Sequence, residues 1–156
     1  MRRGEGPRSI CTIGYSTRPF TEFLALLQSH QVATLVDVRI YPYSKRYPHF
    51  SKDSLEEMLP SGSVRYLYLG RELGGYRRGG FEAYMRTTEF ASGIDALEVI
   101  GQDAKAAFMC CERFPWKCHR RFIAAELEQR GWQVIHIIDK DRTWQSKGSR
   151  ELKVEG

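Results

Sequence analysis

The sequence predicts an α/β fold, a single three-layer domain with an open, mostly parallel sheet of about four to five strands and helices on both faces. Short runs that are apolar on both faces, such as residues 10–14 and 106–111, alternate with segments whose apolar residues keep helical spacing. The joints between them are short, which favours parallel strands linked by right-handed crossovers. The chain has 156 residues, 42% of them hydrophobic, and this is enough for one core without disulfide or metal support.

Three strands and two helices are expected in the first half of the chain. The strands are apolar and rich in β-branched or aromatic residues, and they cover residues 10–14, 34–39 and 64–69. Helical spacing of apolar residues predicts a helix over residues 20–30, after Pro19, whose ring suits a first turn. A shorter helix is expected to begin near Ser54 and to end by Pro60, because Ser54 and Glu57 have the spacing of a capping box.

Two segments of the first half are predicted to be loops. Residues 40–50 are aromatic and basic and contain two prolines. Residues 71–80 are rich in glycine and arginine, too rich in glycine for a regular element.

The second half of the chain is expected to complete the sheet. A helix over residues 88–100 is predicted to stop at Gly101, and a second helix over residues 119–130 to stop at Gly131. The strands of this half are predicted over residues 106–111 and 134–138.

These elements divide the chain into three parts. Residues 1–9 are expected to be a flexible arm, residues 10–140 the single α/β domain, and residues 141–156 a polar, irregular tail.

Charge and cysteine content narrow the class of protein. Lys and Arg number 24 against 19 Asp and Glu, and a net charge of +5 favours anionic partners without requiring them. No apolar run reaches the roughly 18 residues that a membrane span needs, and the N-terminus lacks the apolar core of a secretion signal. We therefore expect a cytoplasmic protein without membrane contact. Its four cysteines would be reduced there; they are Cys11, Cys110, Cys111 and Cys118.

Polar residues follow several predicted strands where the apolar runs end. In open parallel sheets, ligands bind outside the carboxyl ends of the strands, near the switch in strand order. The residues placed there are Gly14, Tyr15 and Ser16 after the first strand, Asp37 and Arg39 at the second, and Cys110, Cys111 and Glu112 at the fourth. The sequence therefore predicts a site at this edge of the sheet.

The segment from Cys110 to Arg120 carries the strongest chemical signal. It ends in the first turn of a predicted helix, where free N–H groups and the helix dipole favour anions and lower a thiol pKa. Cys118 would then be partly thiolate, His119 could act as acid or base near neutral pH, and Arg120 could hold phosphate or carboxylate. The alternative is structural: Cys110 and Cys111 are small buried residues, and the arginines are solvated.

Zinc is a second interpretation of the same residues. Cys110, Cys118 and His119 could bind zinc together with Asp37 or His49. However, structural zinc sites usually show two tight ligand pairs, and adjacent Cys118 and His119 would point in different directions on a helix. We therefore predict no cofactor and keep zinc as an alternative.

The loop from Arg39 to Phe50 interleaves basic and aromatic side chains. This combination can hold phosphates while stacking bases, as single-stranded nucleic acid sites do. The alternative is a proline-stiffened loop whose aromatics pack on the sheet.

Five ordered motifs of the chain resemble the bacterial and archaeal family called domain of unknown function 488. They are Thr12-Ile13-Gly14-Tyr15-Ser16, Leu35-Val36-Asp37-Val38-Arg39, Leu73-Gly74-Gly75, the segment from Phe81 to Phe90, and Cys110-x-Glu112-x-x-Pro115-x-x-Cys118-His119-Arg120. The chain departs from the family pattern in two places: Tyr15 stands where the family usually has histidine, and Cys111 where it usually has alanine. The resemblance implies a compact α/β domain with one pocket formed by these motifs and adds Gly74 and Gly75 to the site. It implies no established reaction.

The leading hypothesis is a small enzyme that acts on a phosphate-bearing substrate, a nucleotide or nucleic acid. The expected catalytic residues are Cys110, Glu112, Cys118 and His119. The expected substrate-binding residues are Gly14, Tyr15, Ser16, Asp37, Arg39, Gly74, Gly75 and Arg120. The alternatives are a non-catalytic nucleic-acid-binding module and a zinc-stabilised interaction domain.

Overall fold

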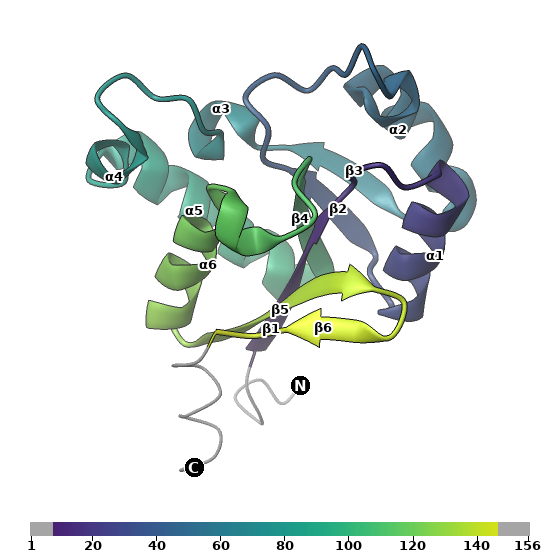
Figure 1. The fold of residues 1–156 in the computed structure, drawn as a ribbon. Coiled ribbons are helices and arrows are strands. Elements are labelled where there is room, and N and C mark those ends of the chain that lie inside the picture. Colours follow the sequence, from purple (N-terminus) through teal and green to yellow (C-terminus); the bar gives the residue numbers. More distant parts are fainter. Residues whose placement is uncertain (1–7, 147–156) are drawn as a thin grey trace.

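Six strands form one sheet in the order β3-β2-β4-β1-β5-β6 in the computed structural model, which describes residues 8–146 (Figure 1). The first five strands of this order are parallel, and β6 is antiparallel to β5. The strands are β1 (Arg8–Gly14), β2 (Thr34–Asp37), β3 (Arg65–Tyr68), β4 (Ala106–Cys110), β5 (Trp132–Asp139) and β6 (Arg142–Trp144). The predicted open, mostly parallel sheet is confirmed, with one more strand than expected.

Helices cover both faces of the sheet (Figure 1). The α-helices are α1 (Phe20–Ser29), α2 (Lys52–Met58), α3 (Gly70–Leu73), α4 (Phe81–Tyr84), α5 (Thr88–Asp103) and α6 (Arg120–Gln129). Short 3₁₀ turns occur at η1 (Pro48–Phe50), η2 (Leu59–Gly62) and η3 (Pro115–Lys117). No helix within residues 8–146 is long and apolar enough to cross a bilayer.

The alternation of side chains along each strand produces two cores. On β2, Leu35 packs with α1 and α2 on one face, while Val36 packs with α5 and α6 on the other. On β1, Cys11 belongs to the same core as Leu35, and Ile10 belongs to the same core as Val36. A strand buried on both faces must be apolar at successive positions, which explains the continuous apolar runs of the sequence.

The strand order locates the edge where a ligand can bind. Strands β1 and β4 are neighbours, yet β1 continues into α1 on one face and β4 into α6 on the other. The two connections therefore diverge at the carboxyl ends of these strands and leave a crevice there. Gly14 and Cys110 end the two strands and pair directly with each other.

Two helix ends differ from the predictions. Helix α2 starts at Lys52 after Ser51, and no side chain caps it, so the capping box expected from Ser54 and Glu57 is wrong. Helix α5 continues through Gly101 to Asp103 instead of stopping. A Cβ atom at Gly101 would lie 2.9 Å from the Trp132 ring, so this glycine permits close packing of helix on strand rather than ending the helix.

Two segments expected to be irregular form regular elements. The glycine- and arginine-rich segment begins with one turn of helix, α3, because Leu73 is buried in the core against Gly93 of α5. Residues 142–144 of the expected tail form β6, whose Trp144 ring packs 5.4 Å from the His136 ring of β5. The expected N-terminal arm is also shorter, since β1 begins at Arg8. The remainders of the predicted arm and tail, 1–7 and 147–156, lie outside the described residues.

Candidate functional site

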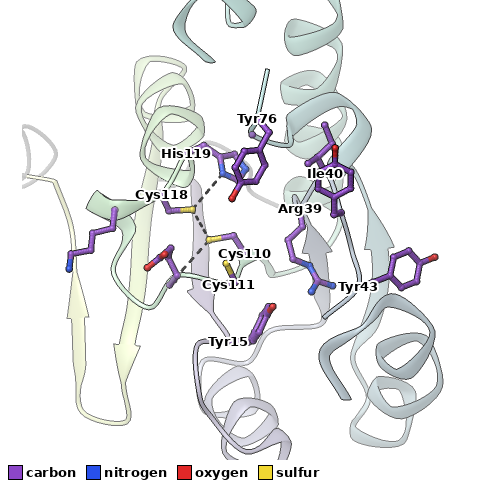
Figure 2. A pocket seen from close by; sticks show the side chains of 13 residues that line it. Tyr15, Arg39, Ile40, Tyr43, Tyr76, Cys110, Cys111, Cys118 and His119 are labelled. Atoms are coloured by element: carbon purple, nitrogen blue, oxygen red, sulfur yellow. Dashed lines mark hydrogen bonds between the residues drawn. The ribbon is translucent and has the colours of Figure 1, made fainter. Parts of the chain in front are cut away.

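A cavity of about 440 Å³ opens at the carboxyl ends of the parallel strands (Figure 2). Its lining comes from segments that follow β1, β2, α3 and β4 and from the segment before α6. The lining residues are Tyr15, Arg39, Ile40, Tyr41, Tyr43, Gly75, Tyr76, Cys110, Cys111, Glu112, Lys117, Cys118 and His119. Seven of the predicted site residues therefore share one cavity: Tyr15, Arg39, Gly75, Cys110, Glu112, Cys118 and His119.

Close contact between the ends of β1 and β4 forms the floor of this region. A Cβ atom at Gly14 would lie 1.7 Å from the Glu112 carbonyl oxygen, so any side chain at position 14 would push the two segments apart. Two backbone bonds continue the pairing beyond the strands: Tyr15 N–H donates to the Cys110 carbonyl at 3.1 Å, and Ser16 N–H to the Cys111 carbonyl at 2.8 Å. Gly14 and Ser16 thus shape the site without lining the cavity.

Cys110 and Cys118 form a buried pair of thiols. Their Sγ atoms lie 2.7 Å apart, and both side chains are less than one-tenth exposed. Cys110 ends β4, and Cys118 precedes α6, so the turn of residues 111–117 brings the two together. The backbone N–H of Arg120, in the first turn of α6, also points at the Cys118 sulfur at 3.4 Å.

His119 lies between the Cys118 sulfur and the backbone of Val38, the residue that follows β2. Its Nδ1 is 3.6 Å from Cys118 Sγ, and its Nε2 is 3.0 Å from the Val38 carbonyl oxygen. A carbonyl can only accept, so Nε2 carries the proton in the neutral ring and Nδ1 presents a lone pair to the sulfur. A Cβ at Gly75 would lie 3.3 Å from this Nδ1, so Gly75 leaves the ring room.

The two thiols differ in acidity. The hydrogen bond from Cys110 lowers the pKa of Cys118 to about 4, with help from His119 and against the effect of burial. Burial raises the pKa of Cys110 well above its ordinary value, and its bond to Cys118 acts in the same direction. The contact between the two sulfurs therefore makes Cys118 the more acidic thiol of the pair and Cys110 the less acidic one.

Arg39 is anchored to Asp37 beside the thiols. Its Nε donates to Oδ1 at 2.8 Å and its Nη2 to Oδ2 at 2.7 Å, and Tyr66 Oη donates to Oδ2 at 2.5 Å. Burial opposes the charge on Arg39, but these bonds to Asp37 raise its pKa above the ordinary value. Asp37 does not line the cavity; it orients Arg39. The remaining nitrogen, Nη1, is buried and finds no acceptor within residues 8–146.

Tyrosines that the sequence did not assign to the site surround the cavity mouth. Tyr41, Tyr43 and Tyr76 line the cavity and are 61–87% exposed, and the rings of Tyr41 and Tyr76 lie 6.4 Å apart. Tyr41 and Tyr43 belong to the aromatic loop of residues 40–50, whose composition could have indicated their role. No sequence pattern pointed to Tyr76. The same loop also serves the core, because Phe50 stacks on Tyr15 with ring centroids 4.5 Å apart.

Arg120 does not hold an anion in this geometry. Its side chain is fully buried and donates to Thr12 Oγ1 at 2.8 Å, to the Glu112 carbonyl at 2.6 Å and to the Arg113 carbonyl at 3.3 Å. It therefore ties the turn after β4 to β1 and α6. Gly74 is also structural, since its carbonyl accepts a hydrogen bond from Arg77 and a Cβ there would lie 2.5 Å from the Gly70 carbonyl.

The expected divergence of Cys118 and His119 is wrong. Both residues precede α6, where Cys118 is extended and His119 caps the helix, so their side chains converge. Across residues 8–146, no three His, Cys, Asp or Glu side chains are grouped as a metal ion requires. The structure thus offers no observation in favour of the zinc alternative.

Residues 19–127 match the family described as "Domain of unknown function DUF488". This confirms the suspected family, and the matched range contains four of the five motifs; the motif at residues 12–16 lies outside it. Comparison with curated proteins and with solved structures finds no match.

Proposed function

Since the chain belongs to the DUF488 family, whose description names no activity, we propose a function from the site itself: a thiol-dependent enzyme that acts on a phosphate-bearing substrate. Cys118 is the nucleophile, His119 its base, and Arg39 the group that holds the phosphate. The cavity volume of about 440 Å³ falls within the roughly 300–1,000 Å³ of small-molecule sites, so a nucleotide is a substrate of suitable size.

One observation carries this proposal: His119 is held by the Val38 carbonyl with its Nδ1 toward the Cys118 sulfur. A nucleophile, a base within reach and a third group that orients the base form the pattern of nucleophilic catalysis. His119 Nδ1 takes the proton of Cys118. The thiolate then forms a bond to an electrophilic centre of the substrate while the bond from that centre to the leaving group breaks, and the leaving group takes the proton from His119. Glu112 lines the same cavity and can exchange a proton with the leaving group or with water.

The substrate class follows from the groups that face the cavity. Arg39 lines the cavity with a positive charge, and its Nη1 has no acceptor within residues 8–146, so an oxyanion that reached Nη1 would gain a charge-assisted hydrogen bond. Lys117 adds a second positive charge to the lining. The exposed rings of Tyr41, Tyr43 and Tyr76 supply faces on which a base can stack.

Protection against alkylation tests the proposal. Iodoacetamide should label Cys118 first, and AMP should slow the labelling while adenosine at the same concentration slows it much less, because the phosphate supplies the contact to Arg39. A nucleotide panel followed by phosphorus NMR should then show conversion by the wild type and none by Cys118→Ser. Equal protection by AMP and adenosine would overturn the phosphate assignment, and unlabelled Cys118 would overturn the nucleophile.

A second candidate is a non-catalytic nucleic-acid-binding module. The exposure of Tyr41 and Tyr76 beside the basic segments favours it. This function requires an affinity for single-stranded oligonucleotides that falls steeply with salt and survives Cys118→Ser. Affinity that does not change with salt would exclude it.

A further inference from the structure

The contact between Cys110 and Cys118 goes beyond what a nucleophile needs. A disulfide bond is about 2.05 Å long, so sulfurs 2.7 Å apart need to approach by only about 0.65 Å to become bonded. The base of Cys118 is already supplied by His119. A second thiol at this distance therefore adds a chemical capacity of its own.

The fold holds the two sulfurs together from both sides. Cys110 is fixed at the end of β4, where its carbonyl accepts from Tyr15 N–H at 3.1 Å. The intervening turn is held by Arg120, whose guanidinium donates to the carbonyls of Glu112 and Arg113. Cys118 N–H donates to the Pro115 carbonyl at 3.1 Å. Bond formation therefore requires little movement of the backbone.

We propose that Cys110 and Cys118 are a redox pair that reduces small anionic disulfides, with Cys118 attacking and Cys110 resolving. The inference rests on the proposed role of Cys118 as a nucleophile and assigns it a second class of electrophile. The division of roles follows from exposure. Both cysteines line the cavity, but Cys118 lies beside His119 and is 8% exposed, whereas Cys110 is 2% exposed and has the Cys118 sulfur 2.7 Å away.

The reaction balances as two thiol–disulfide exchanges. The Cys118 thiolate attacks one sulfur of the substrate, RS–SR, to form a mixed disulfide, Cys118–S–SR, and releases RS⁻. Cys110 then attacks Cys118 Sγ, forming the Cys110–Cys118 disulfide and releasing the second RS⁻, which takes up the proton that Cys110 loses. The substrate gains two electrons and the protein dithiol loses two. A second dithiol restores the pair.

Charge around the cavity favours an anionic substrate. Arg39 and Lys117 both line the cavity and carry positive charge. Glu112 is the one carboxylate among the described lining residues and opposes this preference. Two small disulfides of similar size show which charge the cavity prefers in a substrate. Dithiodipropionate carries two carboxylates, and cystamine carries two ammonium groups.

The experiment uses a Cys111→Ser background, which removes the exposed thiol beside the pair. Reduced protein is mixed with dithiodipropionate, quenched with acid and examined by intact mass and peptide mapping. We expect loss of two hydrogens from the protein, a cross-link between the peptides of Cys110 and Cys118, and recovery with dithiothreitol. Dithiodipropionate should react faster than cystamine, with a ratio that shrinks as salt rises.

Two variants separate the steps. Cys118→Ser should not react, and Cys110→Ser should stop at a mixed disulfide on Cys118. Cys110→Ala provides the same readout if the buried hydroxyl that Cys110→Ser introduces prevents folding. Two results would overturn the inference. One is a mixed disulfide that persists on Cys118 when Cys110 is present, and the other is a faster reaction with cystamine than with dithiodipropionate.

The test distinguishes a failure of the redox pair from a failure of the proposed function. If Cys118 of the parent protein is alkylated by iodoacetamide but dithiodipropionate produces no cross-link, the nucleophile stands and the redox pair fails. If Cys118 of the parent protein resists alkylation, the proposed function itself fails.

Discussion

Arg39 binds the carboxylate of Asp37 through two nitrogens and turns its third, Nη1, to a region without an acceptor among residues 8–146. The two residues are neighbours on opposite sides of Val38, and both are buried. The contact with Asp37 holds the arginine in place at the cavity, and Nη1 is the nitrogen left for the proposed phosphate contact. This division explains why a fully buried aspartate belongs to the site although it does not line the cavity.

Removing Asp37 should destabilise the protein strongly. Asp37→Ala leaves the charge of Arg39 buried without its partner, and breaking a buried ion pair in this way costs about 3–5 kcal/mol of unfolding free energy. Urea denaturation measures the loss. Glu56→Ala, which removes the exposed partner of Lys52, is the matched control and should leave the stability nearly unchanged. A small effect of Asp37→Ala would show that water reaches Arg39.

Replacing Arg39 by lysine should weaken phosphate binding. In Arg39→Lys the single ammonium nitrogen keeps the charge opposite Asp37. No nitrogen then takes the place of Nη1, so the proposed bond to a bound phosphate is lost. A hydrogen bond to a charged group contributes about 1.5–3 kcal/mol, which corresponds to roughly 10–150-fold in Kd. The AMP concentration that protects Cys118 from iodoacetamide should rise accordingly. Protection by adenosine should not change.

The alkylation rate of Cys118 should depend little on pH. Because its pKa is lowered to about 4, the thiolate is already formed at about pH 5.5, and its rate should stay nearly constant up to about pH 8. Cys111 is the internal control: partial desolvation and the negative charges of Cys118 and Glu112 raise its pKa, so its rate should rise across the same range. His119→Asn removes one of the groups that lower the Cys118 pKa and should restore a pH dependence. A Cys118 rate that rises tenfold per pH unit would contradict the assignment.

His136 should make the protein less stable in mild acid. Burial, aided by the charge of Arg120, lowers its pKa to about 3, against about 6.5 in the unfolded chain. The unfolded state therefore binds the proton first, so the stability is complete above about pH 6.5 and falls toward pH 3, by up to about 1.4 kcal/mol per pH unit. Urea denaturation at several pH values checks this slope.

His136→Asn is the matching variant. Its amide oxygen can replace Nδ1 as the partner of Thr12 Oγ1, which lies 2.6 Å from Nδ1, but it does not titrate. The pH slope should therefore shrink. His30→Gln, at a more exposed histidine whose pKa burial also lowers, should remove a smaller part of the slope. An unchanged slope in His136→Asn would place its origin elsewhere.

Gly14→Ala should disrupt the junction of β1 and β4. Its Cβ would overlap the carbonyl oxygen of Glu112, and backbone atoms cannot rotate away as a side chain can. We expect a loss of at least about 3 kcal/mol, beyond ordinary overpacking. Gly62→Ala is the control, since its Cβ meets only the flexible ends of the Leu24 and Gln28 side chains. Thermal denaturation compares the two.

Sequence patterns predicted the sheet well because local composition decides it. Strands buried on both faces must be apolar at successive positions, and β2 and β4 show this directly. The errors came where tertiary contact decides the conformation. Gly101 would end an isolated helix but packs on Trp132, and β6 exists because β5 offers it an edge.

The candidate site was predicted by the rule that ligands bind at strand ends, and Cys110, Glu112, Cys118 and His119 do meet in one cavity. The role of Arg120 could not be predicted, because the sequence around an arginine at the start of a helix is the same whether its side chain binds a ligand or backbone carbonyls. Tyr76 was missed for a related reason: a tyrosine in a glycine-rich loop has no pattern that tells where it points.

By itself, the sequence determined which segments are buried and which polar residues end them, since both depend on neighbouring residues along the chain. The tertiary structure alone decided which of those residues touch. Cys110 and Cys118 are separated by seven residues, and only the turn held by Arg120 brings their sulfurs to 2.7 Å. The acidity of Cys118 and the proposed chemistry of the pair depend on that distance. A distance between residues brought together by the fold cannot be deduced from the neighbouring residues in the sequence.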